Sequence, residues 1–297
     1  MITVDNLVKK FDDFTALNNL TCRIPEGCIY GLVGANGAGK STFLRLITGI
    51  YKPTSGDIAI DGLAVYDKPE TKALFSFVPD DLFLMSGASM NRMAALYRAY
   101  YPSFSNERYK ELTELFGLDP RRSTGTFSKG MKRQAATILS LSCMSKYIFF
   151  DETFDGLDPV MRNLVKKIIY NDVCERGATA VITSHSLREL EDTCDQLALL
   201  YQGGIIFESE IDNLNTKMFK VQVAYSDDYD RSRFEGIEMM QFSKKGSVST
   251  FIARGDKEEV MAKLKAHGPI LLDSLPLSLE EVFVYEMEAL GYAFQLQ

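Results

Sequence analysis

The sequence has no long apolar run, no closely spaced cysteine pair and no excess of positive charge. No apolar run reaches the roughly 18 residues of a membrane-spanning helix, so we expect a soluble chain that meets a membrane only through a partner. The first residues, MITVDNLVKKFDD, contain acids and alternating apolar residues, unlike a secretory signal. The five cysteines lie far apart, which favours reduced thiols in the cytosol over a disulfide framework or a zinc site.

Charge and size limit the function classes further. The chain has 33 Lys and Arg against 40 Asp and Glu, a net charge of −7, so overall charge gives no reason to expect a nucleic-acid partner or binding to anionic lipid. Local basic patches remain possible. At 297 residues, with 46% hydrophobic and 25% charged residues, the chain fits one large domain, or one full domain with a small one.

Strand and helix patterns alternate over the first two thirds of the chain. We expect buried strands at 28–34, 76–81, 146–152 and 178–185, a helix at 40–51, a hairpin at 51–65 and two strands at 197–209. Apolar residues recur at helical spacing between 90 and 117, which predicts two or three helices. This alternation is typical of an α/β fold with a mostly parallel sheet.

The pattern changes near residue 216. From there the sequence predicts three strands, a helix at 257–268, a further strand and a last helix. We therefore expect a main domain at 1–215, with a helical subdomain at about 82–145, and a small C-terminal α+β domain at 216–297. The small domain contains no glycine-rich loop or acid pair, and we interpret it as a packing and dimer-supporting module.

The segment GANGAGKS, between the strand at 28–34 and the helix at 40–51, fits the phosphate-loop pattern through Gly34, Gly39, Lys40 and Ser41. Glycines let backbone amides surround a phosphate chain, and the following helix adds its N-terminal amides. Lys40 would reach the β- and γ-phosphates, and the Ser41 hydroxyl would bind Mg²⁺. The loop alone does not distinguish a kinase, a GTPase, a helicase or a transporter motor.

A second candidate site follows the apolar run YIFF. Asp151 and Glu152 stand at the carboxyl end of this expected strand, where ligands bind in open α/β sheets. Asp151 would hold Mg²⁺, and Glu152 would orient and deprotonate the attacking water. Together the two motifs predict hydrolysis of a nucleoside triphosphate that is bound with Mg²⁺.

Three more motifs, in order and spacing, resemble the ATP-binding cassette (ABC) ATPases. TFSKGMKRQ at 126–134 resembles the signature motif of that family, FDGLDP at 154–159 its D-loop, and TSH at 183–185 its switch histidine. The resemblance covers residues 1 to about 215. It implies an ATPase fold with a phosphate-loop core, an antiparallel β subdomain and an α-helical subdomain.

The resemblance assigns roles by position. It implies that Phe11 stacks on adenine, with Phe14 as the competing candidate. It places the phosphates on Gly34, Asn36, Gly37, Ala38, Gly39, Lys40, Ser41 and Thr42. It also implies that Ser128 and Gly130 meet the γ-phosphate held by a second subunit, that Asp158 lies at the dimer interface, and that His185 contacts the γ-phosphate and the water.

Two departures from the family pattern stand out. The signature has Lys129 and Met131 where LSGGQ has glycine and glutamine, while Ser128 and Gly130 remain. Asp80 occupies the place of a glutamine that offers a neutral oxygen to Mg²⁺; a carboxylate there is expected to ligate the metal but to reach less far.

The acid after proline, the SKGMKRQ form and SLEEVF at 278–283 resemble bacterial exporter-type members most. This implies a motor on the cytoplasmic face of the membrane, paired with a separate permease of about six helices, acting as a homodimer or with a second ATPase chain. The aromatic residues of 96–104 are expected on the permease-facing surface. Two alternatives stay open: a soluble ABC ATPase acting on ribosomes or DNA, and a regulatory subunit without transport.

Overall fold

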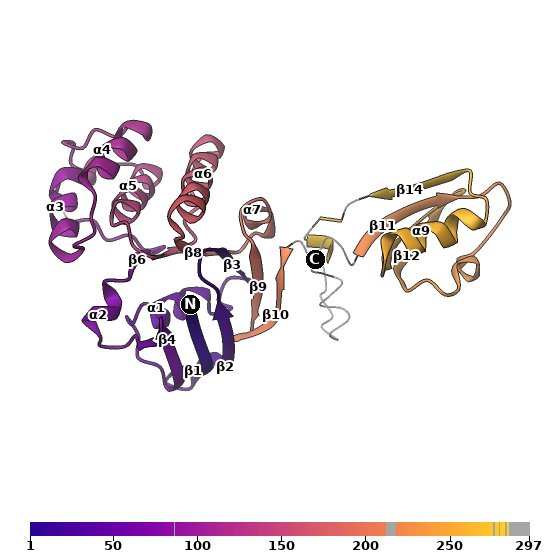
Figure 1. The fold of residues 1–297 in the computed structure, drawn as a ribbon, viewed down its shortest axis with the longest axis horizontal. Coiled ribbons are helices and arrows are strands. Elements are labelled where there is room, and N and C mark those ends of the chain that lie inside the picture. The colour runs from indigo at the N-terminus through magenta and orange to yellow at the C-terminus, as the bar shows by residue number, and fades with distance from the viewer. Residues whose placement is uncertain (86, 212–217, 276, 279, 283, 285–297) are drawn as a thin grey trace. The chain divides into compact units, whose positions relative to one another are not determined.

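The computed structural model describes residues 1–85, 87–211, 218–275, 277–278, 280–282 and 284 (Figure 1). The chain divides into two compact units, Met1–Glu208 and Ser209–Gln297. The domain boundary expected near residue 215 lies outside the described residues.

A six-stranded sheet forms the centre of the first unit, in the order β10-β9-β3-β8-β7-β6. Its strands are β3 (Ile29–Val33), β6 (Phe75–Val78), β7 (Tyr147–Asp151), β8 (Thr179–Ser184), β9 (Gln196–Tyr201) and β10 (Gly204–Glu210). The pairs β3–β8, β3–β9, β6–β7 and β7–β8 are parallel. Strands β3, β7 and β8 are buried at every position, which explains their continuous apolar runs. Parallel pairing also brings the carboxyl ends of these strands to one edge.

A second, antiparallel sheet has the order β2-β1-β4-β5, with β1 (Ile2–Phe11), β2 (Phe14–Ile24), β4 (Ser55–Ile60) and β5 (Leu63–Ala64). Helix α1 (Lys40–Ile47) packs against β7 of the central sheet and against β2 and β4, so one core serves both sheets. The helix is shorter than the expected 40–51. It ends because Gly49 adopts a left-handed conformation (φ 65°), which breaks the helical path.

Helices α3 (Met90–Tyr100), α4 (Asn106–Leu115) and α5 (Lys129–Ser142) form a strand-free block, seen as a cluster in Figure 1. Both α3 and α4 pack on α5. Serine hydroxyls cap all three helices: Ser89 accepts from the amide of Arg92, Ser105 from that of Arg108, and Ser128 from that of Met131. The remaining helical segments of the unit are α2 (Pro69–Lys72), η1 (Thr124–Thr126), α6 (Pro159–Arg176) and α7 (Leu187–Glu191).

The second unit contains an antiparallel sheet in the order β12-β13-β11-β14. Its elements are β11 (Met218–Ala224), η2 (Arg231–Phe234), β12 (Met239–Lys245), β13 (Val248–Arg254), α9 (Lys257–Ala266) and β14 (Leu271–Leu275). Val260 and Leu264 of α9 pack in one core with Val221 and Phe251 of the sheet. The first strand expected after residue 216 corresponds to β11, and the helix expected at 257–268 corresponds to α9. The expected last helix lies largely outside the described residues.

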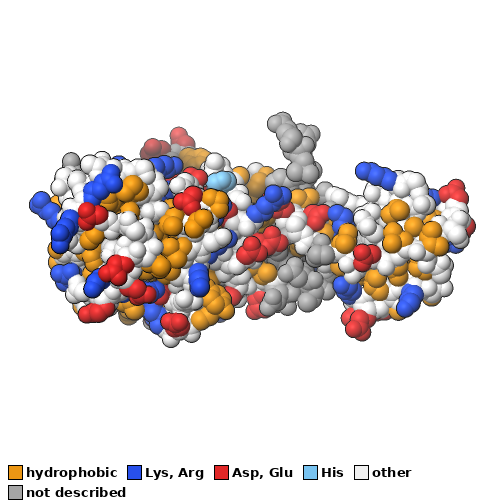
Figure 2. All heavy atoms as spheres, turned by 90° about the horizontal axis from the view of Figure 1, so that it is seen from above, with side chains coloured by type: hydrophobic (Ala, Val, Ile, Leu, Met, Phe, Trp, Pro, Cys, Tyr) orange, Lys and Arg blue, Asp and Glu red, His pale blue; other side chains and the backbone are white. Residues whose placement is uncertain are grey.

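Within the described part of the chain, no helix combines the length and apolarity needed to cross a membrane. Figure 2 shows acidic, basic and hydrophobic side chains interspersed over the face that it presents.

Candidate active site

The phosphate loop joins the carboxyl end of β3 to the start of α1. Two of its glycines are required by close packing: a Cβ on Gly34 would lie 2.5 Å from the Leu200 carbonyl oxygen, and one on Gly39 would lie 2.7 Å from Leu17 Cδ2. Gly39 also has φ 112°, a conformation that side chains disfavour. Residues 35–37 are exposed while Ala38 is buried, so the loop presents its backbone outward over a packed base.

The Lys40 side chain is buried within this loop, with 5% of its surface exposed. Its ammonium donates to the carbonyl oxygens of Gly34, at 2.6 Å, and Ala35, at 3.2 Å. It also lies 3.1 Å from Glu152 Oε1, forming an ion pair shielded from water. The sequence predicted both residues but not this contact between them.

Asp151 and Ser41 meet at the carboxyl end of β7. Asp151 Oδ1 accepts hydrogen bonds from Ser41 Oγ at 3.0 Å and from Thr183 Oγ1 at 2.8 Å. Asp151 Oδ2 is buried and has no hydrogen-bond partner among the described residues. Burial raises the pKa of Asp151 above its usual value, although both hydroxyl bonds oppose this; the charges of Asp80 and Glu152 also raise it.

These oxygens fit a divalent cation. A carboxylate oxygen without a partner and a serine hydroxyl on the same carboxylate are the hard donors that Mg²⁺ prefers. A bound cation would also satisfy the buried charge of Asp151. Two of the three predicted ligands, Ser41 and Asp151, thus lie together.

Glu152 follows directly in a left-handed backbone conformation with φ 48°, which is strained for a residue with a side chain. Its amide donates to Thr183 Oγ1, the same hydroxyl that donates to Asp151. Its Oε2 lies 2.9 Å from His185 Nδ1 and accepts from the His185 amide at 3.3 Å. One carboxylate therefore joins Lys40 to His185, and 13% of the Glu152 side chain is exposed.

The signature residues lie at the start of α5, where Ser128 is the N-cap and its hydroxyl accepts from Met131 N. These residues lie beside the loop that follows β7. A Cβ on Gly130 would lie 3.1 Å from the Gly156 carbonyl oxygen, and Lys129 Nζ lies 3.7 Å from Asp155 Oδ2. Asp158 caps α6 by accepting from the amides of Val160 and Met161. Among the described residues, no hydrogen bond or ion pair joins these candidates to the phosphate loop.

Asp80 has a partner that the sequence did not suggest. Its Oδ1 accepts from Arg133 Nη2 at 2.7 Å, and its carboxylate is 52% exposed whereas the Arg133 side chain is 1% exposed. The carboxylate that was expected to replace the family glutamine at the metal is thus paired with the signature helix.

Phe11 ends β1 and is 38% exposed. Its ring packs edge-on against Tyr51, with centroids 5.4 Å apart, and the Lys9 ammonium lies 4.8 Å from its centroid. Phe14 is 63% exposed. Both rings are accessible to a ligand, and adenine stacking on Phe11 stays a prediction.

Comparisons with known proteins bear on this site. A sequence model described as ABC transporter matches residues 17–155. The chain is 30% identical over 285 residues to the ABC transporter ATP-binding protein YtrB of Bacillus subtilis (strain 168), covering 96% of this chain and 97% of YtrB. The chain belongs to the ABC transporter ATPases.

Two further similarities agree with this family. The lantibiotic transport ATP-binding protein SrtF of Streptococcus pyogenes is 31% identical over 229 residues, covering 76% of this chain and 98% of SrtF. A solved ATP-binding subunit of an ABC transporter superposes with a TM-score of 0.67 at 26% identity, covering 72% of this chain and 92% of that one. The fold and the ATPase class expected from the sequence are thereby confirmed.

Sequence reasoning missed two residues of this ABC ATPase site. Thr183 bridges Asp151 and the Glu152 amide, and Arg133 holds Asp80. Both stood within the quoted motifs TSH and TFSKGMKRQ. Neither motif indicated which residue its side chain would contact, because both contacts join segments far apart in the chain.

Proposed function

We propose that the chain hydrolyses ATP to drive a separate membrane permease in the export direction, from the cytoplasmic face of the membrane. The observation that carries the chemistry is the chain of contacts Ser41–Asp151–Thr183–Glu152, which ends with Lys40 and His185 on the Glu152 carboxylate. Transport is supported by the names of YtrB and SrtF. The export direction rests on the resemblance of the Asp80, SKGMKRQ and SLEEVF segments to exporter-type members.

Each residue has one task in this proposal. The loop amides at 34–42 and Lys40 bind the phosphates, while Ser41 and Asp151 Oδ2 hold Mg²⁺. The bound ion would neutralise charge on the phosphate oxygens. Glu152 takes a proton from the attacking water, and His185 keeps the Glu152 carboxylate in place through its Nδ1 contact.

The signature motif completes the site from a second copy. Ser128 is exposed and stands at the N-terminus of a 14-residue helix, α5, whose first amides and dipole favour an anion. In a head-to-tail dimer these groups would face the γ-phosphate held by the other chain. Asp158, exposed at the start of α6, would lie at the same interface.

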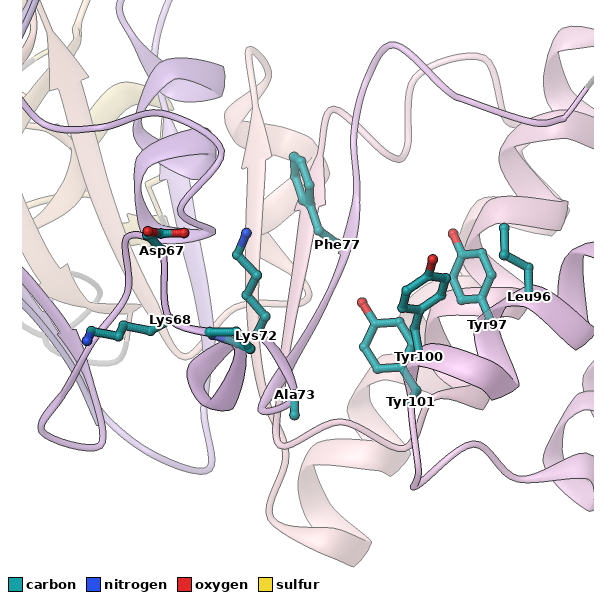
Figure 3. Close-up of a pocket in the computed structure, with 10 residues that line it drawn as sticks. Asp67, Lys68, Lys72, Ala73, Phe77, Leu96, Tyr97, Tyr100 and Tyr101 are labelled. Carbon is teal, nitrogen blue, oxygen red and sulfur yellow. The ribbon is translucent and has the colours of Figure 1, made fainter.

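A groove beside the helical block suits a segment of the permease. It has a cavity volume of about 520 Å³ and lies between the segment 67–73 and helix α3 (Figure 3). One wall presents Tyr97 and Tyr101, whose rings stack with centroids 6.0 Å apart, together with Tyr100, which is 73% exposed. The opposite wall presents Asp67, Lys68 and Lys72, so cations outnumber the acid there. We assign to this groove a short cytoplasmic helix of the permease that carries apolar residues toward the tyrosines and an acid toward the lysines.

Glu152→Gln tests the catalytic assignment. The amide keeps the shape of the side chain but cannot accept the proton of water, so we expect ATP binding with turnover reduced by roughly 10²-fold or more. Glu114→Gln is the matched control, because Glu114 lies 70% exposed on α4 and should change nothing. Lys40→Ala should abolish ATP binding. Full turnover in Glu152→Gln would remove Glu152 from the mechanism.

A further inference from the structure

We propose that Arg133 is a positioning residue, which ties the signature helix α5 to the loop after β6 through Asp80 and thereby makes the signature serine respond to the nucleotide site. This inference rests on the proposed function, since it needs a site where ATP binds and a dimer in which Ser128 acts. It assigns to Asp80 a contact different from the metal contact expected of the family glutamine.

The Arg133 guanidinium makes three contacts with two consecutive residues. Nη1 donates to the carbonyl oxygens of Pro79, at 3.1 Å, and Asp80, at 3.2 Å, while Nη2 donates to Asp80 Oδ1 at 2.7 Å. Only 1% of the Arg133 side chain is exposed, and its Nε has no partner among the described residues. A buried charge needs these acceptors, so the loop and the helix are held in one relative position.

On the helix side, Arg133 lies five residues after Ser128, about 7 Å along the axis of α5. The helix is buried continuously from Ala135 to Ser142 and starts at the Ser128 cap. Backbone hydrogen bonds between successive turns connect Arg133 to the Ser128 cap, beginning with the bond from Lys132 N to the Ser128 carbonyl oxygen. Any displacement of Arg133 therefore moves the hydroxyl and the free amides at Ser128.

On the nucleotide side, the loop leaves the sheet next to the metal site. Strand β6 pairs in parallel with β7, with Val78 opposite Phe150, so Asp80 and Asp151 follow the ends of neighbouring strands. The two carboxylates therefore stand at one edge of the sheet, where a charge that arrives beside one acts on the other through space. Occupation of the site beside Asp151 therefore acts on Asp80.

The same geometry argues against Asp80 as a metal ligand. If its carboxylate turned to a cation, Arg133 would lose its anionic partner in a position closed to water. Asp80 thus fits the link to α5 better than the ion, and Ser41 with Asp151 remain the ligands of the proposed function.

A double-mutant cycle tests the link in the full chain carrying Glu152→Gln. The variants are Arg133→Met, Asp80→Asn and their combination, with Arg108→Met as control because it breaks a comparable shielded pair, to Asp172, that ties α4 to α6. Three quantities are measured: Mg-ATP affinity of the dilute chain, ATP-driven dimer formation by sedimentation, and hydrogen exchange of the amides at 129–133 without nucleotide.

We expect both single variants to weaken dimer formation by roughly tenfold and to speed exchange at 129–133, with Mg-ATP affinity within about twofold of the parent. The combined variant should be no worse than Arg133→Met, because both changes break one pair. Arg108→Met should lower thermal stability without these effects. If Arg133→Met does not fold, Asp80→Asn still tests the link, since its side chain is half exposed.

Additive losses in the double variant, or unchanged exchange at 129–133 in Asp80→Asn, would overturn the link. A large loss of Mg-ATP affinity confined to Asp80→Asn would also overturn it, by making Asp80 a metal ligand. Failure of the parent itself to bind ATP would count against the proposed function instead, and the exchange measurement without nucleotide would still decide the link.

Discussion

The ion pair between Lys40 and Glu152 leads to a prediction about ATP affinity. Lys40 cannot bind the phosphates while its ammonium stays 3.1 Å from Glu152 Oε1, and the carboxylate repels an incoming γ-phosphate. Both effects oppose nucleotide binding in the free chain. Glu152→Gln removes the charge and keeps the shape, so it should bind ATP more tightly as well as hydrolyse it more slowly.

The size of this effect follows from the geometry. Two unit charges 3.1 Å apart attract by about 5 kcal/mol at an effective dielectric constant of about 20. Desolvation of the pair offsets much of this energy, and Lys40 keeps its bonds to the Gly34 and Ala35 carbonyl oxygens. A remaining difference of about 1–2 kcal/mol corresponds to ATP binding tighter by about 5- to 30-fold.

Calorimetric titration with Mg-ATP at protein concentrations where the chain is monomeric measures the effect. Measuring the same change in a Ser128→Arg background separates the effect on affinity from dimerisation, because the arginine fills the space for the γ-phosphate held by the second chain. Equal or weaker affinity in Glu152→Gln would refute the reasoning. So would an equal gain in Glu114→Gln, because that carboxylate is exposed and remote from Lys40.

Three other predictions concern charge. Because burial raises the pKa of Asp151, keeping its carboxyl group ionised lowers folding stability at any pH above the usual carboxyl range. Asp151→Asn should therefore raise the Tm of the metal-free chain at pH 7, by about 2–4 °C for each 1 kcal/mol of stability recovered, and should change the Tm little at pH 4. Burial alone would raise the pKa of Asp61, but its hydrogen bonds with Lys146, the N-terminal amine and Tyr147 lower this pKa overall. Asp61→Asn should therefore lower the Tm at pH 7, and the difference in Tm from the unmodified chain should shrink below about pH 4. Changing both Lys68 and Lys72 to Glu should keep ATP hydrolysis by the isolated chain within about twofold, but should reduce the fraction of the chain recovered in washed cell membranes. The control Lys110→Glu, at an exposed position of α4, should leave that fraction unchanged. Equal membrane recovery of the unmodified chain, the double variant and the control would contradict the groove assignment.

The phosphate loop could be predicted because its determinants are local. Gly39 needs a positive φ, Lys40 opens a helix, and the strand before them is wholly apolar, so eight consecutive residues carry the signal. Asp151 and Glu152 were predictable for the same reason, since they directly follow a buried strand. The parallel sheet then follows from the alternation of such strands with helices.

The contacts between these segments could not be predicted from local patterns. Arg133 reads as one of several basic residues on an amphipathic helix, yet its side chain is buried and reaches a loop more than fifty positions earlier. Thr183 reads as an ordinary β-branched strand residue. Its hydroxyl becomes informative only once parallel pairing sets it opposite Asp151. The missing information was strand order and register.

Each acid of the site has its own partner, and this determines what nucleotide can change. Asp80 is held by a buried guanidinium and Asp151 by two hydroxyl groups, so nucleotide can act on either acid without breaking these contacts. Glu152 alone shares its charge with the residue that binds phosphate. When Lys40 turns to the nucleotide, Glu152 loses its cation but keeps its bonds to His185 and its strained backbone. In the proposed function, nucleotide binding thus releases the carboxylate to which we assign proton acceptance, at the moment when a water has a phosphate to attack.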